Sequence, residues 1–186
     1  MDAPPFLSGQ LLLAMPGMGD PRFERAVIAI CVHDQHGAVG IGIGHQRAGT
    51  RLRSLMAQLG VGPGLAPDAP VLHGGPVEPG RGFVLHSADW GGQDTVAVAG
   101  LGAMTGTIDV LRAIAEGHGP RHKVLALGYA GWAAGQLDAE IQSNGWLMAP
   151  ADPEIVFGRD NDAKWLMALR AIGVDPSLLS STAGHA

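Results

Sequence analysis

Short runs of apolar residues recur along the chain and predict the strands of a sheet. Residues 26–32 are apolar at nearly every position, which is the pattern of a strand covered on both faces. The segment 38–44 instead alternates valine or isoleucine with glycine, so one face of this strand is bare and can lie close to another backbone. A turn at 34–37, which ends in glycine, joins the two strands as a hairpin.

The rest of the chain mixes further strands with helices. Shorter apolar runs predict strands at residues 11–14, 71–73, 82–86, 95–104, 123–129, 146–149 and 155–157. Helical periodicity and capping residues predict helices at 52–59, 108–116, 133–143 and 162–172, with a helical turn at 21–25. We expect 71–73 and 82–86 to pair as a second hairpin around 78–80. Because strands and helices do not alternate strictly, the pattern favours an α+β fold.

Length and composition indicate one domain. The 186 residues can bury a core without disulfides, and the single cysteine, Cys31, suits a reducing cytoplasm. No cationic segment followed by an apolar one opens the sequence, and the apolar runs are far shorter than the ~20 residues that span a bilayer. We therefore expect a cytoplasmic protein without membrane attachment, with a flexible N-terminus at 1–5, one domain at 6–179 and a C-terminal tail at 180–186.

The charge of the chain argues against direct nucleic-acid binding. Its formal net charge is −5, and its 12 lysines and arginines are thinly spread. Nucleic-acid-binding domains usually carry a basic stripe that meets phosphates. The nearest group of this kind is Arg47, Arg51 and Arg53, followed by residues 121–123, and we interpret both as solvated surface.

A set of motifs, taken in order, resembles the AlgH/YqgE family of bacterial proteins along nearly the full chain. The motifs are LLAMP at 12–16, DPRF at 20–23, CVH at 31–33, GAVG at 37–40, GGPV at 74–77, RGFVLH at 81–86, GYAGW at 128–132, GQL at 135–137, EI at 140–141, Asn144, WL at 146–147 and GHA at 184–186. Each motif alone is weakly specific, whereas the ordered set is highly specific. The chain departs from the family at 43–46, which read Ile-Gly-His-Gln where Ile-x-Asn-x-Pro is usual.

The resemblance implies a bent mixed or antiparallel sheet that forms a partial barrel, flanked by about four helices. It implies no accepted enzymatic activity and no cofactor. The family carries a transcriptional-regulator label without a recognised DNA-binding motif, so we expect a regulatory or interaction module that acts indirectly. The family's asparagine is replaced by His45 here, which puts in doubt any role for an asparagine side chain at that position.

A glycine corner is the best candidate for binding a small molecule. The groups that we expect to meet there are Gly74, Gly75, Arg81, His86, Trp132 and Gln136. Backbone N–H groups of a glycine turn, a guanidinium and an imidazole together suit an anionic ligand. The alternative is structural: the glycines only turn the chain, Arg81 pairs with a carboxylate and His86 makes a structural hydrogen bond. For the function of the protein, a hydrolase or transferase that uses Arg81 and His86 is a further alternative, and a regulator that binds DNA directly is a second one.

The predicted strand 26–32 and the turn after it carry candidate residues for a metal site and for a reactive thiol. The candidate ligands are Cys31, His33 and His36, because strand alternation puts Cys31 and His33 on one face and His36 lies in the adjoining turn. A fourth ligand is not evident, and a cysteine in an apolar strand is typical of a small buried hydrophobe. A nucleophilic thiol would need exposed, electropositive surroundings.

The chain has four tryptophans, which are either packing residues or anchors for a protein partner. Trp132 and Trp146 bracket the helix predicted at 133–143, and Trp165 lies in the last predicted helix. We interpret them as core or rim packing, because an indole buries a large area with one N–H to satisfy. The alternative is a surface that binds a protein partner, where tryptophan is a favoured anchor.

Overall fold

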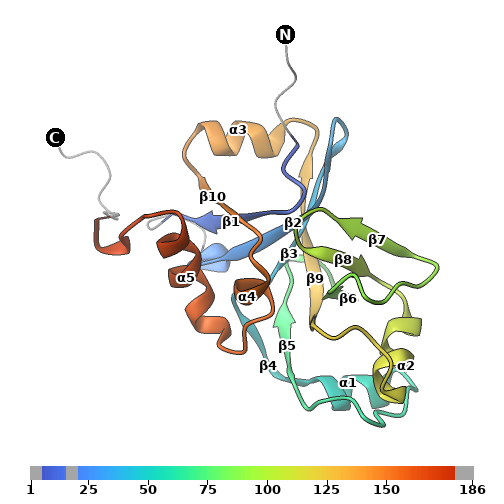
Figure 1. Ribbon diagram of the computed structural model, residues 1–186. Helices are drawn as coiled ribbons and strands as arrows, with labels where there is room; N and C mark the ends of the chain where they lie inside the picture. Colours follow the sequence, from blue (N-terminus) through green and yellow to red (C-terminus); the bar gives the residue numbers. More distant parts are fainter. Residues whose placement is uncertain (1–5, 16–20, 179–186) are drawn as a thin grey trace, which may run out of the picture.

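Residues 6–15 and 21–178 are described by the computed structural model, and ten strands in these ranges form one curled, mostly antiparallel sheet (Figure 1). The strands are β1 (Gln10–Ala14), β2 (Val27–Asp34), β3 (Gly37–Gly42), β4 (Gln46–Arg51), β5 (Pro70–His73), β6 (Val77–His86), β7 (Thr95–Val98), β8 (Gly102–Thr105), β9 (Lys123–Ala133) and β10 (Trp146–Pro150). The predicted α+β fold with a bent sheet forming a partial barrel is confirmed. The predicted flexible N-terminus at 1–5 and the predicted C-terminal tail at 180–186 lie outside the described residues.

The long strand β9 is the centre of the sheet. The strand order is β10-β1-β2-β3-β9-β6-β8-β7, and β4 and β5 extend the sheet beside β9. Residues 130–133 of β9 pair with β3, while Ala126 and Leu127 pair with both β5 and β6. The pairing of β5 with β9 is parallel and the other pairings are antiparallel. β9 serves three partners because it is 11 residues long.

The chain crosses over β9 between β5 and β6. These two strands lie on opposite edges of β9, so the hairpin predicted between 71–73 and 82–86 is wrong. The crossing segment begins at Gly74, whose N–H donates to the Leu127 carbonyl at 2.8 Å. A Cβ on Gly75 would lie 2.2 Å from the carbonyl carbon of Tyr129, so only glycine fits this close approach. Apolar periodicity identifies strands, but it does not show which strand lies between them.

Five α-helices occur in the described part of the chain. They are α1 (Leu52–Gln58), α2 (Ile108–Glu116), α3 (Gln136–Gln142), α4 (Pro153–Val156) and α5 (Lys164–Ala171), with 3₁₀ turns at Pro21–Phe23, Asn161–Ala163 and Pro176–Leu178. In Figure 1, α3 lies at one end of the sheet, α1 and α2 lie at the other end, and α4 and α5 lie beside β1 and β10. None of the helices in these ranges has both the length and the apolar character needed to cross a membrane.

The helix α4 replaces the strand that was predicted at 155–157. Asp152 is the N-cap, and its Oδ1 accepts a hydrogen bond from the Glu154 N–H at 2.9 Å. Pro153 occupies the first turn, where its missing N–H costs nothing. The side chains of Ile155 and Val156 are buried, so the apolar run does mark a buried segment. A run of this length does not distinguish a strand from a helical turn, and the cap decides between them.

Three apolar clusters fill the molecule. The first lies between the sheet and the helices α4 and α5, and the second lies under α3. Along β2, Val27 and Ala29 belong to the first cluster while Ile28 and Ile30 belong to the second, so the predicted burial of this strand on both faces is confirmed. The third cluster joins α1 and α2 to the adjoining parts of β5, β6 and β9.

Lys164 at the start of α5 is a buried cation without an acidic partner among the described residues. Its side chain is fully buried, and Nζ donates to the Ile43 carbonyl at 3.1 Å. Burial lowers the pKa of Lys164 from 10.5 to about 8. The folded protein therefore carries the cost of a desolvated charge at neutral pH, and this cost is relieved as the pH rises from about 8 toward 10.5.

We expect the stability of the protein relative to its Lys164→Met variant to increase by about 2–3 kcal/mol between pH 7 and pH 10. Between these pH values the unfolded chain holds a proton on Lys164 that the folded chain releases, so stability rises with pH. Urea unfolding of both proteins at the two pH values measures the difference, and the variant is the control for every other titrating group. Equal pH dependence of the two proteins would contradict the assignment.

Candidate functional site

The glycine corner that was predicted to cradle an anion is the point where the chain crosses β9. The Gly74 N–H is bonded to the Leu127 carbonyl and is therefore not offered to a ligand. Gly74 and Gly75 line a hollow of only about 20 Å³, next to His45. This is room for about one water molecule. His45 has its Nε2 2.8 Å from the Glu24 carbonyl.

Trp132 and Gln136 meet at a larger cavity, which lies between the end of β9 and α3. The volume of this cavity is about 620 Å³, and Trp146 forms another wall. Pro76 and Val77, the residues that follow the glycine corner, also line it. We call this space the indole cavity. It lies next to the hollow at the glycine corner, because Pro76 lines both.

Glu140 supplies the charged group of the indole cavity. Its Oε2 accepts hydrogen bonds from Trp132 Nε1 at 2.8 Å and from Trp146 Nε1 at 3.0 Å. Its Oε1 accepts a hydrogen bond from Gln136 Nε2 at 3.1 Å. The two tryptophans are buried, and their rings meet edge to face with centroids 6.4 Å apart. The interpretation of these tryptophans as packing residues is confirmed, and Glu140 provides the acceptor that their N–H groups need.

Arg81 and His86 do not line the indole cavity. The Arg81 guanidinium is exposed, lies 3.4 Å from Glu78 Oε2 and stacks over the Phe83 ring at 5.1 Å. His86 is fully buried five residues further along β6, a span of roughly 16 Å. The structure thus brings Trp132 and Gln136 together, sets the glycine pair beside them, and leaves the arginine and the histidine elsewhere.

His86 belongs to a continuous chain of hydrogen bonds. Its Nδ1 is 2.8 Å from the Ser87 carbonyl, which can only accept, so Nδ1 carries the proton and donates. In the neutral ring Nε2 then accepts from the Thr105 hydroxyl at 2.8 Å, and that hydroxyl is 2.8 Å from the Thr95 hydroxyl. Thr95 in turn accepts the Gly92 N–H at 2.7 Å. Both ring nitrogens are occupied, which is the arrangement of a structural imidazole.

The proposed metal ligands are separated by a bulge in β2. The pairing register with β3 shifts at Cys31, which breaks the strand alternation. Cys31 packs in the first cluster, whereas His33 Nδ1 accepts the Leu7 N–H at 3.0 Å and Nε2 lies 3.7 Å from Asp138 Oδ2. The expectation that Cys31 and His33 share a face is therefore wrong. His36 is exposed in the turn, and nowhere in residues 6–15 or 21–178 do three potential metal ligands gather.

The thiol of Cys31 is enclosed in the core. Burial raises the pKa of Cys31 to about 12, and its Sγ lies 3.6 Å from the Ala29 carbonyl. The thiol is therefore protonated at neutral pH. A protonated, buried thiol is a poor nucleophile.

The basic group Arg47, Arg51 and Arg53 is engaged with neighbouring loops. Arg47 donates to the Pro79 carbonyl at 2.8 Å, and Arg53 donates to the Ala66 carbonyl at 2.7 Å. Arg51 likewise donates to a loop carbonyl, at 2.5 Å. These guanidinium groups hold loops in place instead of forming a free stripe for phosphates.

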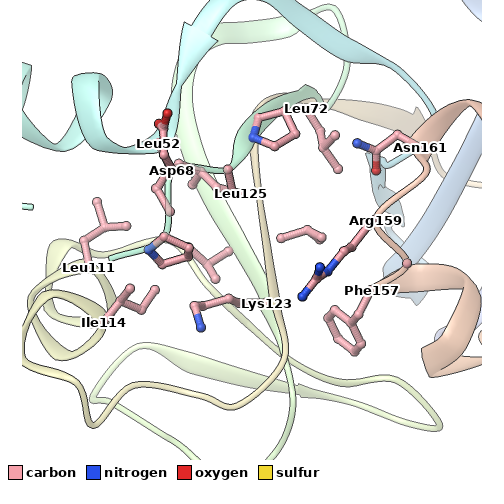
Figure 2. A pocket seen from close by; sticks show the side chains of 16 residues that line it. Leu52, Asp68, Leu72, Leu111, Ile114, Lys123, Leu125, Phe157, Arg159 and Asn161 are labelled. Atoms are coloured by element: carbon pink, nitrogen blue, oxygen red, sulfur yellow. The ribbon is translucent and has the colours of Figure 1, made fainter. Parts of the chain in front are cut away.

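A second cavity, which the sequence did not predict, lies between α1, α2 and the connection from α4 to α5 (Figure 2). Its volume is about 380 Å³. The apolar walls are Leu52, Leu72, Val84, Leu111, Ile114, Leu125 and Phe157. We call this space the apolar cavity. Its lining comes from at least five separate segments of the chain, so no local sequence motif predicts this cavity.

Two cationic residues line the apolar cavity. Figure 2 shows the Arg159 side chain extending from the α4–α5 connection toward Lys123, at the start of β9. Arg159 makes no hydrogen bond, ion pair or ring contact with any residue in the described ranges. The Lys123 ammonium donates to a single carbonyl, that of Pro120, at 3.2 Å. Asp68 also lines the cavity, but its carboxylate is paired with Arg51 at 3.5 Å.

Asn161 adds a buried amide to the same wall. The residue is only 4% exposed, and its side chain makes no hydrogen bond within the described part of the chain. In this part of the chain, every fully enclosed side-chain nitrogen or oxygen has a hydrogen-bond partner. Because the Asn161 amide has no such partner, it is not fully enclosed, and it remains accessible beside the cavity that it lines. An unpaired amide at such burial is unusual unless something else binds it.

The protein has an α+β fold that is built on one bent sheet with helices at both ends. Residues 11–177 match the AlgH-like family model, and the chain is a member of this family. It is 56% identical to the UPF0301 protein of Novosphingobium aromaticivorans over 181 residues, which cover 97% of each chain. It is 54% identical to the UPF0301 protein of Rhizorhabdus wittichii over the full length of both.

Solved structures have the same fold. The solution structure of the AlgH protein from Pseudomonas aeruginosa superposes with a TM-score of 0.79 at 40% sequence identity, covering 100% of this chain and 99% of that one. A crystal structure of a protein from Corynebacterium diphtheriae superposes with a TM-score of 0.73 at 24% identity, covering 91% and 89%. The second likeness concerns the fold alone.

Proposed function

We propose that the protein is a binding module without catalytic action, which takes a small anion with an apolar body into the apolar cavity and thereby regulates a protein partner. The observation that carries this proposal is the combination of an apolar cavity of about 380 Å³ with an unpaired guanidinium and an unpaired buried amide in its wall. Ligand sites are typically cavities of this kind, with a few converging polar groups.

The charges around the cavity select the sign of the ligand. Arg159 and Lys123 contribute two positive charges, while the negative charge of Asp68 is already compensated by Arg51. A carboxylate or phosphate placed between them would gain charge-assisted hydrogen bonds, and the Asn161 amide can add one more N–H. The apolar walls then favour a ligand whose remaining surface is hydrocarbon.

The position of the cavity supports a regulatory role. Its walls join α1, α2, the strands β5, β6 and β9 and the α4–α5 connection, which are far apart in the sequence. A ligand that contacts all of these segments would restrict their motion relative to one another. A partner that recognises this surface would then distinguish the bound state from the free state. Such a module would act indirectly, through another protein and not by binding DNA itself.

Octanoate is a suitable probe, and we expect it to bind and to raise the melting temperature. At 100 times its dissociation constant it should stabilise the protein by about 2.7 kcal/mol. For a chain of this length that is a rise of about 5–10 °C. Arg159→Gln should weaken octanoate binding by about tenfold or more, because the charge that pairs with the carboxylate is lost. Titration calorimetry of both proteins measures the change.

The controls separate this site from general effects of charge and hydrophobicity. Arg112→Gln removes another exposed guanidinium, on α2 outside the cavity lining, and should leave octanoate binding unchanged. Octanol should bind the wild-type protein at least tenfold more weakly than octanoate. If octanoate does not bind, or binds Arg159→Gln as tightly as wild type, the proposal fails.

A further inference from the structure

We propose that the indole cavity is a second binding site, which takes a small organic cation with an apolar body and pairs it with Glu140. This site is independent of the apolar cavity and has the opposite charge. Among the described residues that line the indole cavity, Glu140 is the one with an ionisable side chain. Within the described ranges, no arginine, lysine or histidine forms an ion pair with it.

The hydrogen bonds of Glu140 orient the carboxylate without neutralising it. All three of its donors, two indole N–H groups and one amide N–H, are uncharged. A carboxylate has about four acceptor positions, so the three bonds leave one of them free. The negative charge is therefore held in a fixed geometry at the wall of a cavity, which is the complement of an ammonium or guanidinium group.

The aromatic residues around Glu140 suit the same ligand. The rings of Trp132 and Trp146 line the cavity, and Phe23 packs edge to face on Trp146 with centroids 5.9 Å apart. Aromatic faces attract organic cations and also accept their hydrocarbon parts. A volume of about 620 Å³ accommodates more than the charged group alone.

The negative charge of Glu140 is opposite to the positive charge that the sequence predicted for a ligand site at the glycine corner. Two of the predicted ligand-binding residues, Trp132 and Gln136, do line the cavity. The cation and the imidazole that were expected to attract an anion, Arg81 and His86, do not. The group that determines the ligand is Glu140, so the same corner is assigned to a cation.

Hexylammonium tests the proposal, with the indole N–H signals of ¹⁵N-labelled protein as the readout. We expect the signals of Trp132 and Trp146 to shift saturably, because their N–H groups donate to the carboxylate that binds the amine. The signal of Trp165, whose N–H donates to the Ala14 carbonyl at 3.0 Å, should not move. Hexanol, which has the same chain without the charge, should bind at least tenfold more weakly.

Two variants locate the charge that is responsible. Glu140→Gln keeps an oxygen that can accept the indole N–H groups, and it should lower hexylammonium affinity at least tenfold. Asp138→Asn removes a neighbouring negative charge of α3 that is not part of the lining, and it should leave the affinity unchanged. No saturable shift with hexylammonium, equal binding of hexanol, or equal binding by Glu140→Gln would each overturn the proposal. The hexanol comparison uses the wild-type protein, so it remains decisive if a variant fails to fold.

Discussion

Gly75→Ala is expected to destabilise the protein by about 4 kcal/mol or more, which is enough to prevent folding in a protein of ordinary stability. A Cβ at this position would lie 2.2 Å from the Tyr129 carbonyl carbon and 2.5 Å from the Ala130 nitrogen. Both atoms are backbone atoms of the central strand β9, so neither can move without disturbing its pairing. The φ angle of Gly75, 154°, adds strain for any residue with a side chain.

Gly80→Ala is the matched control for this substitution. Gly80 lies in β6, and nothing lies within 4 Å of a Cβ built on it. We expect its free energy of unfolding in urea to remain within about 0.5 kcal/mol of wild type. The expected result for Gly75→Ala is a large loss of stability or no soluble folded protein while Gly80→Ala folds normally. A Gly75→Ala protein within 1 kcal/mol of wild type would show that the crossing over β9 is not as close as described.

Glu140→Ala is expected to have the second largest effect, a loss of about 4 kcal/mol. The change leaves the N–H groups of Trp132 and Trp146 without an acceptor, and these residues are only 8% and 6% exposed. An unpaired buried donor costs about 1–3 kcal/mol, and here there are two. The edge-to-face contact of the two rings would also lose the group that fixes their orientation.

Glu140→Gln separates the acceptor from the charge. Its side-chain oxygen can still accept from both indoles, so we expect a loss of only about 1 kcal/mol. Glu154→Ala, which removes an exposed glutamate, should change the free energy of unfolding by no more than about 0.5 kcal/mol. Denaturant unfolding of the three variants measures these values. If Glu140→Ala is as stable as Glu140→Gln, the indole N–H groups are satisfied in another way.

The strands and helices were largely predictable because burial imposes a period on the sequence. The alternating segment 38–44 became β3, and the fully apolar segment 26–32 became β2 with both faces covered. The prediction failed where the same apolar pattern is compatible with more than one structure. The run at 155–157 fits a helical turn as well as a strand, and the cap at Asp152 decides. The pairing of β5 and β6 also failed, because periodicity carries no information about the strand between them.

The candidate sites were predictable only as far as their residues are close in the sequence. Trp132 and Gln136 meet because one turn separates β9 from α3. The bulge at Cys31 separated two residues that simple alternation had put together. The apolar cavity had no local signal, since Lys123 and Arg159 come from different parts of the chain and line one cavity only in the folded structure. Glu140 was visible in the sequence, but its two indole partners identify its role only in three dimensions.

The two cavities give the protein two sites of opposite charge in one fold. The apolar cavity presents the positive charges of Arg159 and Lys123, and the indole cavity presents the negative charge of Glu140. The lining residues of the two cavities do not overlap, so each can be tested without disturbing the other. A charge-reversed pair of probes, octanoate and hexylammonium, should therefore bind at the same time.

Intermolecular nuclear Overhauser effects between octanoate and the labelled protein test the proposed ligand site most directly. We predict contacts from the hydrocarbon chain to the methyl groups of Leu111, Ile114 and Leu125, and a shift of the Arg159 side-chain signals when the carboxylate binds. Contacts to the methyl groups of another cluster, or bound octanoate without any contact to these three residues, would contradict the proposal.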